Sequence, residues 1–344
     1  MKKRYFITVL CIAAVIGAAF LIVRYTRVPI PDSSSGRIAT YTRNKPDAEL
    51  TVAVINENGT EIKAYGHDGA EIEVPKRSYE IGEITGTFTG ALLAEACEKG
   101  LVSLDDPISD VIHLTKEAYS PTLFELVTQS SAYAQFFPRT SGERSDNPYG
   151  GITGNDIVSA MNTFRLTYEP PFLYSASDFG VAVLGSAIAK LYNVDFYSIL
   201  TIFAQEKLGL EHTFVPLEKC MDNGWKWSTK DAYIAAKGFV SDISDMISYA
   251  KVFLNDDFPF IRTASDALYE TNAEKSSGFL WNVSRKGWIL SQSGETDHYS
   301  ASVMIDKNNR IAVVVLSNYP NDAYGDTMGI AECLLKEQTE SLIQ

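Results

Sequence analysis

One short stretch places a carboxylate where a helix is predicted to begin. Glu83-Ile84-Thr85-Gly86 opens an apolar pattern at helical spacing, which predicts a helix over residues 85–99. The helix dipole would stabilise a carboxylate at this end, so Glu83 could act as a general base or cap the helix. Gly86 brings no functional group and costs about 1 kcal/mol of helix propensity relative to Ala.

Other patterns that could carry chemistry are sparse. Ser248-Tyr249-Ala250-Lys251 has a nucleophile-to-base spacing, but the amphipathic repeat over residues 243–254 predicts a surface helix. His298 follows Asp297 and invites a Ser, His and Asp arrangement with Ser293. The other histidines, at positions 67, 113 and 212, are interpreted as surface or packed residues. Cysteine and histidine spacings predict no metal site, and no cofactor motif is present.

Composition restricts the class of protein. The chain has 344 residues, of which 45% are hydrophobic and 21% are charged, and these values are typical of a globular fold. Its net charge is −13, and no cluster of Lys and Arg follows the first few residues. Nucleic acids are bound through basic surfaces, so the composition predicts no nucleic-acid partner.

The N-terminus predicts a membrane anchor. Lys2, Lys3 and Arg4 precede residues 6–23, a run of uncharged and mostly apolar side chains near the length of a bilayer-spanning helix. We therefore expect a cytoplasmic stub and anchor over residues 1–27, with the lipid bilayer as a partner. A cleaved signal peptide is the alternative. The polar, turn-rich residues 28–48 are expected to form a linker, and residues 49–344 an extracytoplasmic domain of a bacterial protein.

The remaining pattern predicts a sheet interrupted by helices. Two strand-like runs, residues 50–55 and 60–65, flank Asn58-Gly59, a strong hairpin signal. Residues 122–254 are mainly helical in pattern, and four further strand-like runs follow at 278–283, 288–291, 300–305 and 310–316, with a closing helix at 329–342. The first and last segments must then meet in one sheet, with the helical part inserted between them.

Several stretches in the right order carry a resemblance to a known family. Residues 81–89 match, without a gap, a stretch that commonly reads Ile-Gly-Ser-x-Thr-Lys-x-Phe-Thr, and further similar stretches lie at 101–107, 123–131, 171–176, 207–210 and 288–318. Together they resemble the class C-like branch of the serine β-lactamase and penicillin-binding-protein family. The resemblance implies an α/β (α+β) fold of the β-lactamase/DD-peptidase type, an antiparallel sheet flanked by helices with an inserted, mainly helical subdomain.

The same resemblance identifies the degenerate positions of the family's active site. Its nucleophilic Ser and activating Lys correspond to Glu83 and Gly86, and the Asn of its Tyr-x-Asn motif corresponds to Ala176. Tyr174 is retained. The Lys or His of the third motif corresponds to Gln292.

Some features of the family's ligand site remain. Ser293 and Gly294 keep the small residues along which a ligand backbone could lie, so the resemblance implies a ligand site at Tyr174, Ser293 and Gly294. Tyr133, Phe136 and Phe137 could wall the cleft or belong to the core.

Two functions follow as hypotheses. The first is a membrane-anchored protein that lacks the Ser-x-x-Lys machinery and acts as a non-catalytic ligand-binding, immunity or regulatory protein. Its partner would be a cell-wall peptide, a related small ligand or another envelope protein. The alternative is a hydrolase of peptide, amide or ester substrates with rebuilt chemistry at Glu83 and Tyr174, joined by Glu295 or Asp297. Under the non-catalytic hypothesis, Glu83 fills the vacated pocket or caps the helix.

Overall fold

A computed structural model of the chain describes residues 30–136, 147–166, 173–218, 221, 223–284 and 286–342. The strands in chain order are β1 Leu50–Asn56, β2 Gly59–Tyr65, β3 Glu71–Ile72, β4 Tyr79–Glu80, β5 Val240–Ser241, β6 Tyr269–Glu270, β7 Lys275–Gly278, β8 Trp281–Ser284, β9 Ile289–Glu295, β10 Ser300–Asp306 and β11 Ile311–Ser317. The helices are α2 Ser34–Thr42, α3 Ile84–Glu98, α4 Leu123–Val127, α5 Gly154–Thr163, α6 Asp178–Tyr192, α7 Phe196–Ile202, α8 Ile234–Lys237, α9 Ile243–Asn255, α10 Pro259–Thr263 and α11 Thr327–Ser341.

The main sheet joins the two ends of the domain. Its strand order is β3-β2-β1-β11-β10-β9-β8-β7-β6, and each neighbouring pair is antiparallel. β1 pairs with β11 in the register Leu50↔Ser317, so the expected meeting of the first and last segments is confirmed. The hairpin between β1 and β2 turns at Glu57-Asn58, and Gly59, the first residue of β2, has a φ of 134° that favours glycine. The expected fold class is confirmed.

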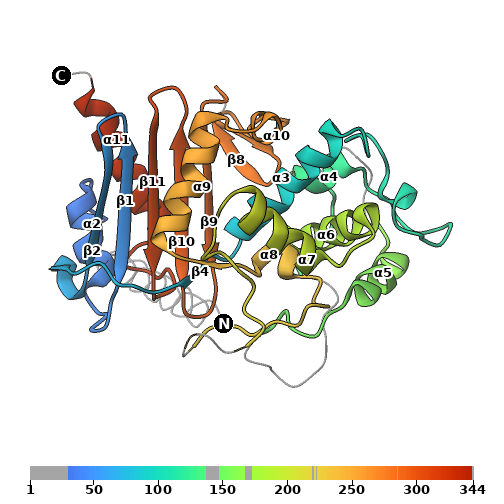
Figure 1. The fold of residues 1–344 in the computed structure, drawn as a ribbon, viewed down its shortest axis with the longest axis horizontal. Helices are drawn as coiled ribbons and strands as arrows, with labels where there is room; N and C mark the ends of the chain where they lie inside the picture. Colours follow the sequence, from blue (N-terminus) through green and yellow to red (C-terminus); the bar gives the residue numbers. More distant parts are fainter. Residues whose placement is uncertain are drawn as a thin grey trace, which may run out of the picture.

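Side-chain alternation along the central strands gives the sheet two buried faces. Leu50, Val52 and Val54 of β1 face a cluster that includes Ile38 of α2 and Ile330 of α11. The intervening residues of β1 and β11 belong to the larger core on the other face, where α9 lies over the sheet (Figure 1). Helices on both faces therefore bury the apolar strands that the sequence pattern predicts.

The prediction of a linker over residues 28–48 is wrong for Ser34–Thr42, which form helix α2. Ser33 caps this helix by accepting a hydrogen bond from the Gly36 backbone N–H, and Ile38 and Tyr41 are buried. The Tyr41 hydroxyl contacts Ser317 Oγ at 2.9 Å and the Tyr319 carbonyl at 2.8 Å, which ties α2 to the end of β11. Short polar residues that resemble a linker in sequence are here the start of a packed helix.

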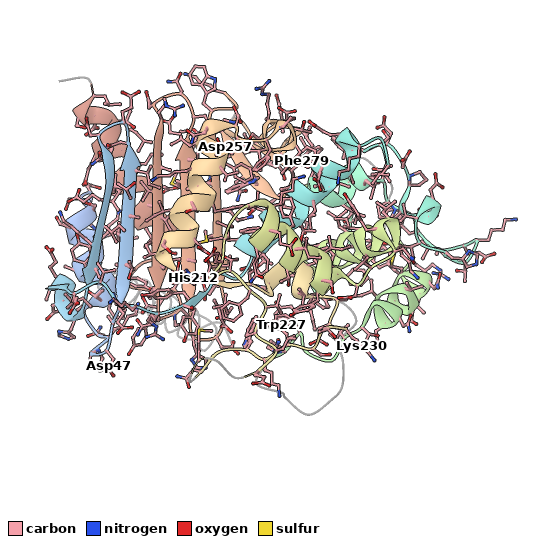
Figure 2. All side chains as sticks on the ribbon, in the orientation of Figure 1. Asp47, His212, Trp227, Lys230, Asp257 and Phe279 are labelled. Atoms are coloured by element: carbon pink, nitrogen blue, oxygen red, sulfur yellow. The ribbon has the colours of Figure 1, made fainter. Side chains whose placement is uncertain are left out.

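Two further boundaries differ from the prediction. The strand expected over residues 278–283 is broken, because Phe279 and Leu280 have φ of 47° and 65° and form the turn between β7 and β8. Figure 2 labels Phe279 where the sheet meets the helical part. The helical subdomain expected over 122–254 ends earlier, because α9 packs on β10 and β11 rather than within the helical part.

Residues 6–23, the expected anchor, lie outside the described residues. Among the helices that are described, none is by itself both long and apolar enough to cross a bilayer. One pair, Asp178–Tyr192 with Phe196–Lys207, passes that test on length and composition together, with a bend of 84° between its parts.

Candidate functional site

The start of α3 lies directly against the end of β9, and two glycines allow this approach. Gly82 has a φ of 50°, and a Cβ placed on it would lie 2.4 Å from the Glu295 backbone nitrogen. A Cβ on Gly294 would lie 1.9 Å from the Ile81 carbonyl oxygen and 2.7 Å from the Glu83 nitrogen. Only residues without a Cβ fit this junction, which places Glu83 beside the last residues of β9.

A pocket of about 350 Å³ opens at this junction. All seven residues that the sequence analysis placed in the site line it, namely Glu83, Gly86, Tyr174, Ala176, Gln292, Ser293 and Gly294. They come from the start of α3, the segment before α6, and β9. The side chains predicted to share one site therefore do so, although they are spread over more than half of the chain.

Glu83 occupies this pocket in an ion pair. Its Oε1 pairs with Lys237 Nζ, and its Oε2 accepts a hydrogen bond of 2.8 Å from the Glu295 backbone N–H. Glu83 stands at the N-cap position of α3, but its side chain makes no capping hydrogen bond to the helix. Of the two structural roles expected for Glu83, capping is wrong and occupation of the pocket is what the geometry shows.

Lys237 is the site residue that the sequence analysis missed. It ends α8, its side chain is only 6% exposed, and its Nζ lies 3.2 Å from the Glu295 carbonyl oxygen and 3.8 Å from Asp178 Oδ2. A buried lysine requires a partner of opposite charge. The signal in the sequence was a single Lys inside the apolar stretch of residues 234–240, which indicates a buried charge in need of a carboxylate.

Asp178 forms the second carboxylate partner of Lys237. Burial raises the pKa of Asp178, while the positive charge of Lys237 acts in the opposite direction. The Tyr149 hydroxyl donates a hydrogen bond of 2.9 Å to Asp178 Oδ2, and burial raises the pKa of Tyr149 well above its ordinary value. One lysine is thus shared by two carboxylates at the base of the pocket.

The last residues of β9, which line the pocket, have no β8 partner on one side. β8 pairs with β9 only at Asn282↔Ser291 and Val283↔Leu290, so residues 292–295 continue beyond the end of that pairing. The N–H groups of Ser293 and Glu295, two residues apart, face the same side of the strand. In an acyl-transfer enzyme, backbone N–H groups of this kind can bind an oxyanion or a substrate carbonyl.

Side chains of the same chain satisfy this edge. The Ser293 N–H donates to Gln292 Oε1 at 3.0 Å, and the Glu295 N–H donates to Glu83. Lys237 in turn donates to the Glu295 carbonyl oxygen. Gln292 is held in place by a hydrogen bond of 2.8 Å from its Nε2 to the Leu280 carbonyl oxygen. A ligand backbone would have to displace these contacts before it could lie along Ser293 and Gly294.

Comparison with known proteins places the chain in one family. The family described as Beta-lactamase matches residues 42–332. The chain belongs to this family.

Similar proteins agree with the family assignment. A β-lactamase of Yersinia enterocolitica is 20% identical, with 77% of this chain and 69% of that protein covered. Protein flp of Staphylococcus aureus strain MW2 is 22% identical, and the match covers 74% of this chain but only 56% of flp. A solved β-lactamase/D-alanine carboxypeptidase of Yersinia pestis, complexed with citrate, superposes with a TM-score of 0.71 at 15% identity, covering 88% and 98% of the two chains.

Tyr174 and Gln129 also line the pocket. Tyr174 is 37% exposed, and burial of the rest of its side chain raises its pKa, so its phenol is held further from ionisation. Gln129 has a φ of 62° and accepts a hydrogen bond at its Oε1 from the Ser177 backbone N–H. Ser177 caps α6, so Gln129 positions the segment that carries Tyr174 and Ala176.

Other sequence candidates lie elsewhere. Asp297 and His298 are exposed and are not among the residues that line the pocket. Ser248 and Lys251 are exposed on α9, as the surface-helix interpretation predicts. Tyr133 is buried in the core against Phe164 and Phe179, and Phe137 lies outside the described residues.

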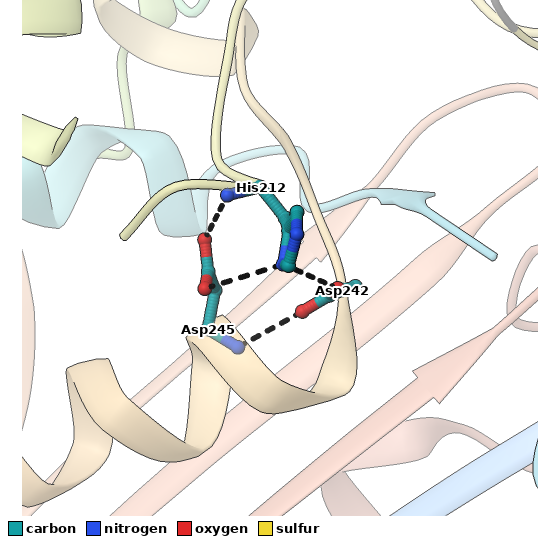
Figure 3. A group of neighbouring side chains, drawn as sticks. All are labelled: His212, Asp242 and Asp245. Carbon is teal, nitrogen blue, oxygen red and sulfur yellow. Dashed lines mark hydrogen bonds and ion pairs between the residues drawn. The ribbon is translucent and has the colours of Figure 1, made fainter. Parts of the chain in front are cut away.

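His212 has partners that its sequence position did not indicate. His212 Nδ1 lies 3.0 Å from Asp242 Oδ2 and 3.8 Å from Asp245 Oδ1 (Figure 3). These three residue types can hold a metal ion, and their candidate ligand atoms lie within 4.8 Å of one another. The carboxylates already have structural roles, because Asp242 caps α9 and Asp245 Oδ2 accepts from the His212 N–H and the Thr213 hydroxyl.

Proposed function

We propose that this chain is a membrane-anchored, extracytoplasmic member of the β-lactamase family that binds a small cell-wall-derived ligand without forming an acyl-enzyme. The observation that carries the proposal is the pairing of Glu83 with Lys237 and with the Glu295 N–H. The nucleophile's position holds a carboxylate, and that carboxylate occupies a donor that acyl transfer would need. The protein would act in the envelope as a binding, immunity or regulatory component.

Loss of the acylation machinery supports the proposal. Acyl transfer requires a nucleophile activated by a neighbouring base. Glu83 and Gly86 supply neither a hydroxyl nor an amine at the two positions, and Ala176 and Gln292 supply no charge. Lys237, the lysine that contacts Glu83, is engaged with two carboxylates and a carbonyl oxygen.

The alternative of a hydrolase rebuilt on Glu83 and Tyr174 has less support. Both oxygens of the Glu83 carboxylate are engaged, one by Lys237 Nζ and the other by the Glu295 backbone N–H. Burial raises the pKa of Tyr174, which disfavours a phenolate. The names of the relatives do not decide the question, since the chain spans only 56% of flp.

Membrane anchoring rests on the uncharged run of residues 6–23 behind three basic residues. Expression of the full chain in a bacterium should place it in the membrane fraction, with residues 30–344 accessible to protease added from outside. Release into the soluble periplasmic or medium fraction as a shorter chain would favour the cleaved signal peptide instead.

The non-acylating function is tested with covalent probes. Full-length protein, purified in detergent, is incubated with a fluorescent penicillin and with a fluorophosphonate, beside an active class C β-lactamase as the positive control. We expect labelling of the control and no adduct on this chain by gel fluorescence and intact mass. A stoichiometric adduct on any serine would overturn the proposal.

Hydrolysis by a non-covalent route needs a second readout. Turnover of ester and D-amino-acid amide substrates should not exceed that of a Glu83→Gln variant. Turnover that is lost in that variant would support the rebuilt hydrolase.

A further inference from the structure

We propose that the pocket selects small ligands that carry a primary ammonium group and rejects ligands that present a carboxylate. This inference rests on the proposed ligand-binding function and adds the chemical class of the ligand. It follows from the charges that surround the pocket and from the hydrogen-bonding groups that remain available there.

The lining of the pocket is acidic. Its charged members are Glu83, Asp178 and Glu295, and no Lys, Arg or His is among the described residues that line it. Lys237 lies behind the lining and supplies one positive charge against the three carboxylates. The group therefore keeps a net charge of −2 when all its members are ionised, and this potential attracts cations and repels anions.

The backbone donors at the β9 edge of the pocket already have acceptors in the chain. The Ser293 and Glu295 N–H groups donate to side chains of the chain itself, and the amide of Gln292 donates to the Leu280 carbonyl oxygen. Asn321 Nδ2 donates to Glu295 Oε2 at 2.9 Å. A ligand carboxylate that approached β9 would therefore meet occupied backbone donors and the negative charge of Glu83 and Glu295.

Acceptors, by contrast, remain accessible. The Glu295 side chain is exposed, and the Glu83 side chain is 33% exposed. An ammonium group has three N–H donors and no acceptor, so it complements carboxylates that line a cleft. The hydroxyls of Tyr174 and Ser293 line the same pocket and could accept further hydrogen bonds.

The closed strand edge favours a small ligand. An extended peptide that added to β9 would have to displace Gln292 from the Ser293 N–H, and Glu83 and Lys237 from Glu295. Displacement of Glu83 would also separate a charge pair whose lysine is buried. A compact amine that fits about 350 Å³ needs none of these changes.

Three probes of similar size separate charge from shape. D-alaninamide carries an ammonium group, N-acetyl-D-alaninamide is neutral and N-acetyl-D-alanine carries a carboxylate. Binding to the full-length protein in detergent is measured by calorimetry at neutral pH and at two salt concentrations. We expect D-alaninamide to bind at least tenfold more tightly than either of the other probes, and to bind more weakly at high salt.

Matched variants assign the effect to the pocket. Glu295→Gln removes a carboxylate but keeps an acceptor for Asn321, and we expect it to weaken D-alaninamide binding about fivefold. Glu57→Gln removes an exposed carboxylate in the turn between β1 and β2, and it should leave binding unchanged.

Equal or tighter binding of N-acetyl-D-alanine would overturn the inference. So would the absence of D-alaninamide binding at millimolar concentration in protein that still unfolds cooperatively, or an equal loss in the two variants. These outcomes leave the proposed non-acylating function standing, because that function fails only on a covalent adduct or on turnover that depends on Glu83.

Discussion

Glu83 and Lys237 are best understood as a pair at the residue scale. They lie 154 positions apart in the chain, and each supplies the charge that the other needs beside the pocket. Without Lys237, the carboxylates of Glu83 and Asp178 would lose the positive charge that they share. Together Glu83 and Lys237 also satisfy both main-chain groups of Glu295. The pair converts a position that the family resemblance assigns to chemistry into one that stabilises the fold.

Breaking this pair should destabilise the domain. We expect Lys237→Met to lower the free energy of unfolding by about 2 to 3 kcal/mol, less than for a fully buried pair because Glu83 is one-third exposed. Urea unfolding measures the change. The double variant with Glu83→Gln should lose less than the sum of the two single variants.

Lys336→Met removes an exposed lysine paired with Glu340 and should cost about 0.5 kcal/mol or less. Additive losses in the double variant would contradict the pairing.

The two glycines of the site should respond in opposite ways to alanine. A Cβ on Gly86 would meet nothing closer than Leu280 at 3.8 Å, so Gly86→Ala should stabilise the protein by about 0.5 to 1 kcal/mol through helix propensity. A Cβ on Gly294 would lie 1.9 Å from a carbonyl oxygen, so Gly294→Ala should cost about 3 kcal/mol or more. Urea midpoints test both. A loss of stability in Gly86→Ala would show that the position needs its glycine.

Helix α2 shows how an element that resembles a linker becomes part of the domain. It covers the face of the sheet that carries Val52 and Val54, beside α11. Its anchoring residue is Tyr41, whose hydroxyl is buried against Ser300 and Ser317. Removal of α2 would expose the apolar side chains beneath it.

A chain that begins at residue 49 should therefore be less stable than one that begins at residue 30. We expect its Tm to fall by about 10 °C or more, because Ile38 and Tyr41 no longer cover the sheet. Differential scanning calorimetry makes the comparison. Tyr41→Phe, which removes only the hydroxyl contacts, should produce a smaller decrease. Equal Tm values for the two chain lengths would show that α2 contributes nothing to the domain.

At the scale of the whole molecule, buried acids give the stability an unusual dependence on pH. In the part of the chain that the structure describes, burial raises the pKa of five carboxyl groups, those of Glu80, Asp178, Asp231, Asp245 and Asp266. Above the ordinary pKa of 4.5 for Glu and 3.8 for Asp, the folded state holds more protons at these groups than the unfolded state. Stability therefore falls as pH rises through the raised pKa values.

We expect the Tm of the protein to be higher at about pH 5 than at pH 7. The net charge of −13 acts in the same direction, since protonation reduces self-repulsion. Glu80→Gln should flatten the profile, because Glu80 is buried and accepts hydrogen bonds from Trp225 and Thr296. Thermal scans across this range make the measurement. A Tm that rises steadily from pH 5 to pH 8 would contradict the prediction.

The sequence by itself determined the sheet, the pairing of its first strand with the last strands, and which residues gather at the site. The hairpin lies within one residue of the Asn58-Gly59 signal, and α3, β10 and β11 lie close to where apolar periodicity predicts them, because those patterns depend on neighbouring residues. The seven predicted site residues share one pocket because ordered motifs fixed their places in the fold.

The tertiary structure decided the state of that site. Asp178 and Gln129 line the pocket from α6 and from the segment after α4, and Lys237 of α8 pairs with Glu83 and Asp178. No local pattern relates these three residues to Glu83. α2 likewise depends on a distant face of the sheet, so its polar sequence resembled a linker. Charge pairing and burial join residues that are far apart in the chain, which is why only the folded chain shows that Glu83 is held by Lys237 and that the edge of β9 is closed.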